Sequence, residues 1–67
     1  MTFGEKIKEA RKSKNLTLED LSKVSGLSLT ILSQLERDHH IPSALSIKKL
    51  SEALEIDYDE LWKLSNR

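Results

Sequence analysis

Residues 17–36 constrain the fold more than any other part of this 67-residue chain. Apolar residues recur at helical spacing on both sides of Gly26. Thr17 and Ser28, which are residue types that cap helices well, precede the two apolar runs. Gly26 suits the end of the first run because glycine adopts a left-handed backbone at little cost. The segment therefore predicts two short amphipathic helices joined by a tight turn.

This pattern is typical of a helix-turn-helix, in which the second helix fits the major groove of DNA. With Leu18 counted as the first position, Ser22 is the fifth, where the two helices cross closely and a small side chain is needed. Gly26 is the ninth, and Ser25 just before it departs slightly from the apolar residue that is common there. A helical bundle that matches the pattern by chance is the alternative. Four leucines are expected to pack both helices on the core: Leu21, Leu27, Leu32 and Leu35.

Three further helices complete an expected all-α fold of five helices, with a single domain over residues 1–67. Thr2 and Glu5 have the spacing of a capping box at the start of the first helix, and Asn15 suits a left-handed residue at its end. Ser43 is expected to cap the fourth helix, and Asp57 opens the fifth. The other residues expected to face the core are Phe3, Ile7, Ala10, Val24, Ile31 or Leu32, Leu45 or Ile47, Leu50, Ala53 and Leu54.

The composition excludes several classes of protein. The chain has no cysteine, so disulfides and thiolate metal sites are excluded. It has no apolar run near the ~18 residues that span a membrane, and its polar start does not resemble a secretory signal. We therefore expect a cytoplasmic protein with no membrane partner. No nucleophile–base pair, paired carboxylates or glycine-rich phosphate loop suggests an enzyme, and no cofactor is expected.

The formal net charge is zero, whereas DNA-binding domains usually present a basic face. The charges are nonetheless separated along the chain. Residues 1–14 carry five basic and two acidic side chains, a net charge of +3, and residues 52–60 carry five acidic side chains and no basic one, −5. A molecule polarised in this way still offers phosphates a favourable face. The early basic residues are either a solvated helix surface or a row of phosphate contacts, for which Arg11 and Lys14 are best placed.

Six stretches of the chain carry a family resemblance. They are IKEAR at residues 7–11, LTLEDLS at 16–22, GLS at 26–28, ILSQLER at 31–37, IPS at 41–43 and LSEALEI at 50–56. With them the chain resembles the Cro and phage-repressor-like helix-turn-helix family, also called the Xre family, over about residues 3–64. The resemblance implies a lambda-repressor-like fold and a sequence-specific transcriptional regulator, in particular a repressor that binds double-stranded DNA.

The resemblance assigns base reading to four residues after the Ser28 cap: Leu29, Thr30, Ser33 and Gln34. Gln34 offers a bidentate match to adenine, and Thr30 can bond a base edge or touch a thymine methyl group. Leu29 departs from the polar residues frequent at its position, and it could pack on a thymine methyl. The alternative is that all four are solvated surface residues.

Phosphate contacts are expected at helix N-termini, whose free N–H groups and positive dipole end favour anions. The candidates there are Thr17 and Leu18 on one helix and Ser28 on the next. Many relatives have a glutamine where this chain has Leu18, so only the backbone N–H of Leu18 can serve. The resemblance adds Arg37, His39, His40 and Ser43 as phosphate contacts, and Arg11 with Glu36 as a structural ion pair that holds the recognition helix on the scaffold.

The adjacent histidines His39 and His40 splay apart and make a poor metal chelate, so no metal site is expected. A solvated loop and a phosphate contact are the two remaining interpretations. If they contact phosphate, affinity should rise as the pH drops through ~6.5, where histidine gains charge.

Relatives bind two half-sites as dimers, so a homodimer on a palindromic operator is expected. The candidate interface residues are Tyr58, Leu61, Trp62 and Leu64, although Trp62 could simply complete the core. The alternative function is a protein-interaction module, such as an antitoxin whose main partner is another protein.

Overall fold

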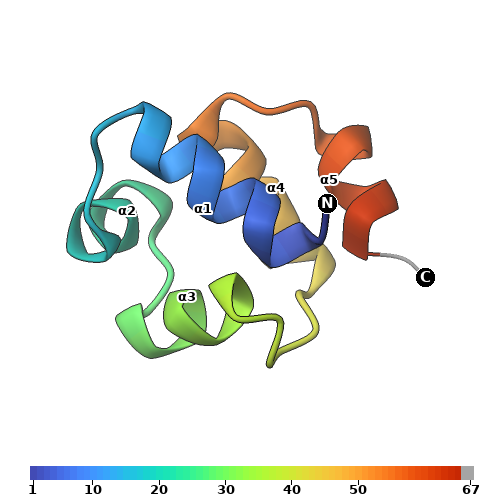
Figure 1. Ribbon diagram of the computed structural model, residues 1–67, viewed down its shortest axis with the longest axis horizontal. Helices are drawn as coiled ribbons and strands as arrows, with labels where there is room; N and C mark the ends of the chain where they lie inside the picture. Colours follow the sequence, from blue (N-terminus) through green and yellow to red (C-terminus); the bar gives the residue numbers. More distant parts are fainter. Residues whose placement is uncertain (66–67) are drawn as a thin grey trace.

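The computed structural model describes residues 1–65, which form five α-helices and, within that range, no strand (Figure 1). The helices are α1 (Phe3–Ser13), α2 (Leu18–Ser25), α3 (Leu29–Glu36), α4 (Ala44–Leu54) and α5 (Tyr58–Ser65). The predicted all-α, five-helix fold is therefore confirmed. No helix in the described part of the chain is long and apolar enough to cross a membrane.

The first helix is central to the packing. In Figure 1, α1 lies in front of α4, with α2 and α3 on one side of the pair and α5 on the other. Helix α1 contacts α3, α4 and α5, while α2 packs on α3 and α4. Each helix contributes at least one side chain to a common core, which consists of Phe3, Ile7, Leu21, Leu32, Leu35, Ile47, Leu50, Leu54 and Leu61.

Local sequence signals account for the helix ends. The Thr2–Glu5 capping box is present, and Thr17 forms a second capping box with Asp20. Asn15 has φ 58°, as its position after α1 predicted, and Gly26 has φ 77° at the end of α2. Polar side chains thus satisfy backbone N–H groups that the first turn of a helix leaves without an acceptor.

The core differs from the prediction on α2. Val24 was expected to face inward, but its side chain is 59% exposed, and Ser25 is buried in the next position. The reason is geometric: Leu21 is the inward residue of α2, and the residue four positions on shares its face. Of the two pairs of candidates for the core, Ile31 or Leu32 on α3 and Leu45 or Ile47 on α4, the fully buried residues are Leu32 and Ile47. Ile31 is only partly buried, and Leu45 is exposed.

The fifth helix also differs from expectation. Leu61 was a candidate for a dimer interface, but it is completely buried in the core of the single chain. Trp62, considered as the residue that completes the core, is 41% exposed instead. The two residues are about 100° apart around a helix, so α5 directs only one of them inward.

Helices α1 and α3 approach each other unusually closely at Gly4. A Cβ atom at this position would lie 2.5 Å from the backbone carbonyl oxygens of Leu35 and Glu36, so only glycine fits. The Asp38 carboxylate strengthens the same junction. It accepts hydrogen bonds from the Thr2 hydroxyl at 2.7 Å and the Gly4 N–H at 2.9 Å. The start of α1 is therefore attached to the end of α3.

Candidate nucleic-acid interface

The outward face of α3 carries the four predicted base-reading residues. Ser28 caps the helix, because its hydroxyl oxygen accepts a hydrogen bond from the Ile31 N–H at 3.1 Å. The buried Leu32 and Leu35 fix which face of α3 points to the core. The remaining face presents Leu29 and Thr30, both exposed, with the partly buried Ser33 and Gln34 one turn further on.

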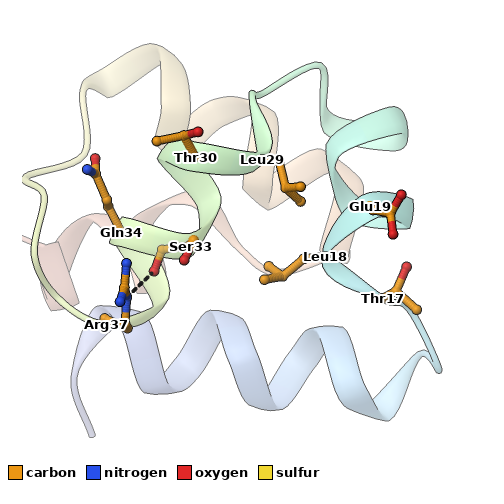
Figure 2. A pocket seen from close by; sticks show the side chains of 8 residues that line it. All are labelled: Thr17, Leu18, Glu19, Leu29, Thr30, Ser33, Gln34 and Arg37. Carbon is orange, nitrogen blue, oxygen red and sulfur yellow. Dashed lines mark hydrogen bonds between the residues drawn. The ribbon is translucent and has the colours of Figure 1, made fainter.

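These residues line a shallow hollow of about 450 Å³ where α2 and α3 begin (Figure 2). Leu18 and Leu29 extend into the space between the two helices, whereas Thr30 and Gln34 project on the side of α3 away from α2. The structure therefore brings the predicted base-reading residues together with Thr17, Leu18 and Arg37 from the predicted phosphate set. The remaining lining residue is Glu19, which the sequence reasoning did not single out.

The turn between the helices is held by short-range hydrogen bonds. The Ser22 hydroxyl donates to the Leu27 carbonyl oxygen at 2.6 Å, and the Leu27 N–H donates to the Ser25 hydroxyl oxygen at 3.2 Å. The small residue expected at the fifth position is thus a serine that bonds to the turn itself. Ser25, at the eighth position, also bonds to the turn, and this hydrogen bond explains why a serine stands where an apolar residue is common. Together these bonds fix how α3 projects from α2.

Arg11 and Glu36 secure the other end of α3. Arg11 Nε donates to Glu36 Oε2 at 2.7 Å and Nη2 donates to Oε1 at 3.1 Å. The remaining nitrogen, Nη1, donates to the Leu16 carbonyl oxygen at 2.8 Å. Only 11% of the Arg11 side chain and 6% of the Glu36 side chain are exposed. The hydrogen bond to Glu36 raises the pKa of Arg11 above its usual value, so the guanidinium stays charged.

The N-terminus of α2 is more acidic than a phosphate site usually is. Thr17 donates its backbone N–H to Asp20 Oδ2, and its hydroxyl oxygen accepts from the Asp20 N–H, both at 3.0 Å. The hydrogen bond from the Thr17 backbone lowers the pKa of Asp20, which keeps that carboxylate charged. Glu19 adds a second carboxylate to the same turn. The Thr17 backbone N–H is therefore engaged within the protein, and the outward N–H groups of the turn are those of Leu18 and Glu19.

The other predicted phosphate contacts lie in the segment that leads to α4. His39 and His40 are exposed and line a separate hollow with Phe3, Pro42 and Leu64. Ser43 caps α4 by accepting from the Ser46 N–H at 3.1 Å. Within residues 1–65 there is no group of three or more histidine, cysteine or acidic side chains placed to hold a metal ion.

The basic row on α1 is largely paired. Lys6 Nζ lies 2.7 Å from Glu60 Oε2, and Lys14 forms an ion pair with Glu55. The hydrogen bond and charge of Glu60 raise the pKa of Lys6, and Lys14 lowers the pKa of Glu55 in the same way. Arg11 and Lys14, the residues best placed for a row of phosphate contacts, are thus each bound to a carboxylate. The acidic C-terminal segment folds back on the basic helix and neutralises part of it.

The predicted dimer residues separate into two groups. Tyr58 and Trp62 lie on the surface of α5 with their rings stacked, 6.2 Å between centroids and 13° between planes. Leu61 is unavailable because it is buried, and Leu64 is partly buried beside the histidine loop. Only the two aromatic residues remain as a prominent exposed part of that set.

Two residues that shape the site escaped the sequence reasoning. Gly4 permits the close approach of α1 to α3, and Asp38 joins the start of α1 to the end of α3. A glycine inside the first turn of a predicted helix is a signal that could have found the first. No local signal identifies Asp38, since its partners are 34 and 36 residues away in sequence.

Comparison with known proteins supports the assignment of the motif. The sequence profile of the helix-turn-helix family matches residues 7–61. The chain is similar to the uncharacterized HTH-type transcriptional regulator YazB of Bacillus subtilis (strain 168), with 39% identity over 59 residues, 88% of this chain and 86% of YazB. It is 38% identical over 61 residues to the HTH-type transcriptional repressor RghR of the same organism, which covers 90% of this chain and 45% of RghR.

A phage protein shows a similar relationship. The immunity repressor protein of Bacillus phage phi105 is 38% identical over 56 residues, 84% of this chain and 39% of the repressor. The chain thus spans most of YazB but less than half the length of these two repressors.

Proposed function

Since this chain belongs to the Xre-type helix-turn-helix family of DNA-binding transcriptional regulators, we propose that it represses transcription by reading an operator sequence with α3 in the major groove. The observation that carries the proposal is the surface shared by α2 and α3. Leu29, Thr30, Ser33 and Gln34 line one hollow together with the first turn of α2, so contacts to bases and to phosphates can form together. A repressing role rests on RghR and the phi105 protein, both of which are named repressors.

Gln34 is the residue expected to discriminate most strongly between bases. Its amide both donates and accepts, which matches the N6 and N7 edge of adenine. A bidentate pair of this kind provides about 1–3 kcal/mol of discrimination. Gln34→Ala should therefore relax the preference at one base pair per half-site, by roughly 5- to 150-fold.

We propose that the chain binds as a homodimer on a palindromic operator. One α3 helix reads only a few base pairs, and two copies related by a two-fold axis read half-sites about 10 base pairs apart. Tyr58 and Trp62 are the proposed contact residues on α5 because they are exposed and stacked on each other.

Selection of bound duplexes from a random pool at low salt tests this function. The expected result is enrichment of a palindrome that the protein occupies as a dimer in sedimentation experiments. Gln34→Ala should lose selectivity, while Glu52→Ala, which removes an exposed side chain on α4, should select the same site. A reporter gene placed downstream of that site should fall in expression when the protein is present; a rise would make it an activator.

The same selection tests the alternative function, in which the chain acts like an antitoxin and its main partner is another protein. The zero net charge and the paired lysines of α1 are the features that favour that alternative. Failure to enrich any duplex would contradict the regulator and favour a role in which a protein is the main partner.

A further inference from the structure

We propose that Leu18 and Leu29 form an apolar clasp for the 5-methyl group of a pyrimidine in the major groove. The inference rests on the proposed docking of α3 and adds the chemistry of one subsite. Leu18 is the first residue of α2 and Leu29 the first residue of α3. Figure 2 shows both side chains in the space between the two helices, at the wall of the hollow that α3 presents to DNA.

The two leucines are held in place by the fold. Leu18 is partly buried and packs against the core, so its position is fixed from behind. Leu29 is 44% exposed on a face otherwise occupied by polar side chains. The serine hydrogen bonds of the turn and the Ser28 cap fix the start of α3 relative to α2. The backbone positions of both leucines are therefore fixed before DNA binds.

The charge around the clasp favours a base edge over a phosphate. Glu19 forms part of the same wall, and Asp20 lies in the same first turn of α2. Carboxylates repel phosphate, whereas the C5-methyl group is the one apolar feature that a base pair displays in the major groove. Such a methyl group occurs on thymine and on 5-methylcytosine, and either one fits an apolar contact of this size.

The size of the effect follows from the burial of one methyl group. Burying one such group contributes about 0.8 kcal/mol, which corresponds to an affinity change of about 4-fold. Replacing a single thymine by deoxyuridine removes the methyl group and leaves the hydrogen-bonding edge intact. We expect this replacement to weaken binding about 4-fold at one position in each half-site and to have little effect elsewhere.

The experiment uses the full chain and the site selected from random duplexes. Each thymine is replaced in turn by deoxyuridine, and affinities are measured for the unmodified protein and for Leu29→Asn, which keeps the side-chain size but replaces methyl groups with an amide. The ratio of thymine to deoxyuridine affinity should fall from about 4 to about 1 in Leu29→Asn and in Leu18→Ala. Leu45→Ala, which shortens an exposed leucine on α4, should leave the ratio unchanged. Because the readout is a ratio, a general loss of affinity does not imitate the effect.

A second arm distinguishes the two sources of the methyl group. Selection is repeated with pools that contain cytosine or 5-methylcytosine. Enrichment of thymine from the unmethylated pool identifies thymine as the ligand, and enrichment only from the methylated pool identifies 5-methylcytosine. The clasp is overturned if no deoxyuridine replacement changes the affinity for the selected site. It is also overturned if the ratio of thymine to deoxyuridine affinity stays at about 4 in Leu29→Asn. Either result leaves the proposed function intact. Failure to select any duplex contradicts the proposed function itself.

Discussion

Removal of the Glu36 side chain should destabilise the whole domain. Glu36→Ala leaves the Arg11 guanidinium in a site where only 11% of its side chain reaches solvent, without the two carboxylate oxygens at 2.7 and 3.1 Å. Breaking a buried ion pair from one side costs about 3–5 kcal/mol. A chain of this length has a total stability of roughly 3–10 kcal/mol, so the substitution should remove a large fraction of it.

Thermal unfolding followed by circular dichroism measures the effect. A loss of about 3 kcal/mol lowers the Tm of a domain this small by roughly 12–24 °C. The matched control is Glu60→Ala, which removes a carboxylate that also pairs with a cation, Lys6, but on the surface. The control should change the Tm only slightly, because exposed pairs are screened by water and salt.

The double variant Arg11→Met with Glu36→Leu separates the ion pair from simple packing. It removes both charges together, so it should recover much of the stability that Glu36→Ala loses. Equal Tm values for Glu36→Ala and Glu60→Ala would refute the reasoning, because they would show that burial does not amplify the interaction. A double variant as unstable as Glu36→Ala would assign the loss to packing instead of unpaired charge.

Four further variants test the backbone and the caps. Gly4→Ala should lower the free energy of unfolding by about 1–3 kcal/mol, because the added Cβ would lie 2.5 Å from two carbonyl oxygens of α3. Urea titration measures this change, and an unchanged unfolding midpoint would contradict the close approach of α1 to α3. Gly26→Ala should lower the free energy of unfolding by about 1–2 kcal/mol through backbone strain alone, since φ is 77° and the added methyl group meets no atom within 4 Å. Gly26→Asn should lower it by less, because asparagine adopts a left-handed backbone more readily than alanine. The pKa of Asp20 lies below its usual 3.8 because of the hydrogen bond from Thr17, so its stabilisation is complete above pH 3.8 and is lost as the pH falls through the lower folded value. Asp20→Asn should therefore lose less stability than the unmodified protein between pH 5 and pH 3, and identical losses would argue against the capping box.

The sequence predicted most reliably what depends on neighbouring residues. Thr2, Thr17 and Ser28 all cap helices, and Gly26 ends α2, because these roles involve atoms only a few positions away. The orientation of a short helix was harder to predict. On α5, Leu61 and Trp62 are both apolar, and only the packing of α5 on α1 and α4 decides which one is buried.

The candidate site shows the same division. The spacing after Ser28 predicts one surface for Leu29, Thr30, Ser33 and Gln34, and the four line the same hollow because a single helix fixes their directions. Their contact with bases stays a prediction. The neutralisation of α1 could not be predicted from charge separation along the chain. Lys14 and Glu55 are 41 residues apart in sequence, and they meet only because α1 and the end of α4 lie together.

The pairing of the α1 lysines has a consequence for how the protein finds its site. A lysine that neutralises a DNA phosphate releases a condensed counterion, and each such contact adds about 0.9 to the slope of log affinity against log salt concentration. Lys6 and Lys14 each lie against a carboxylate, so a phosphate contact by either lysine would have to displace Glu60 or Glu55 first. Counterion release strengthens binding to every DNA sequence equally. Its reduction lowers the affinity for random DNA, and with less protein held at random sites, base contacts determine a larger share of where the protein resides along the genome.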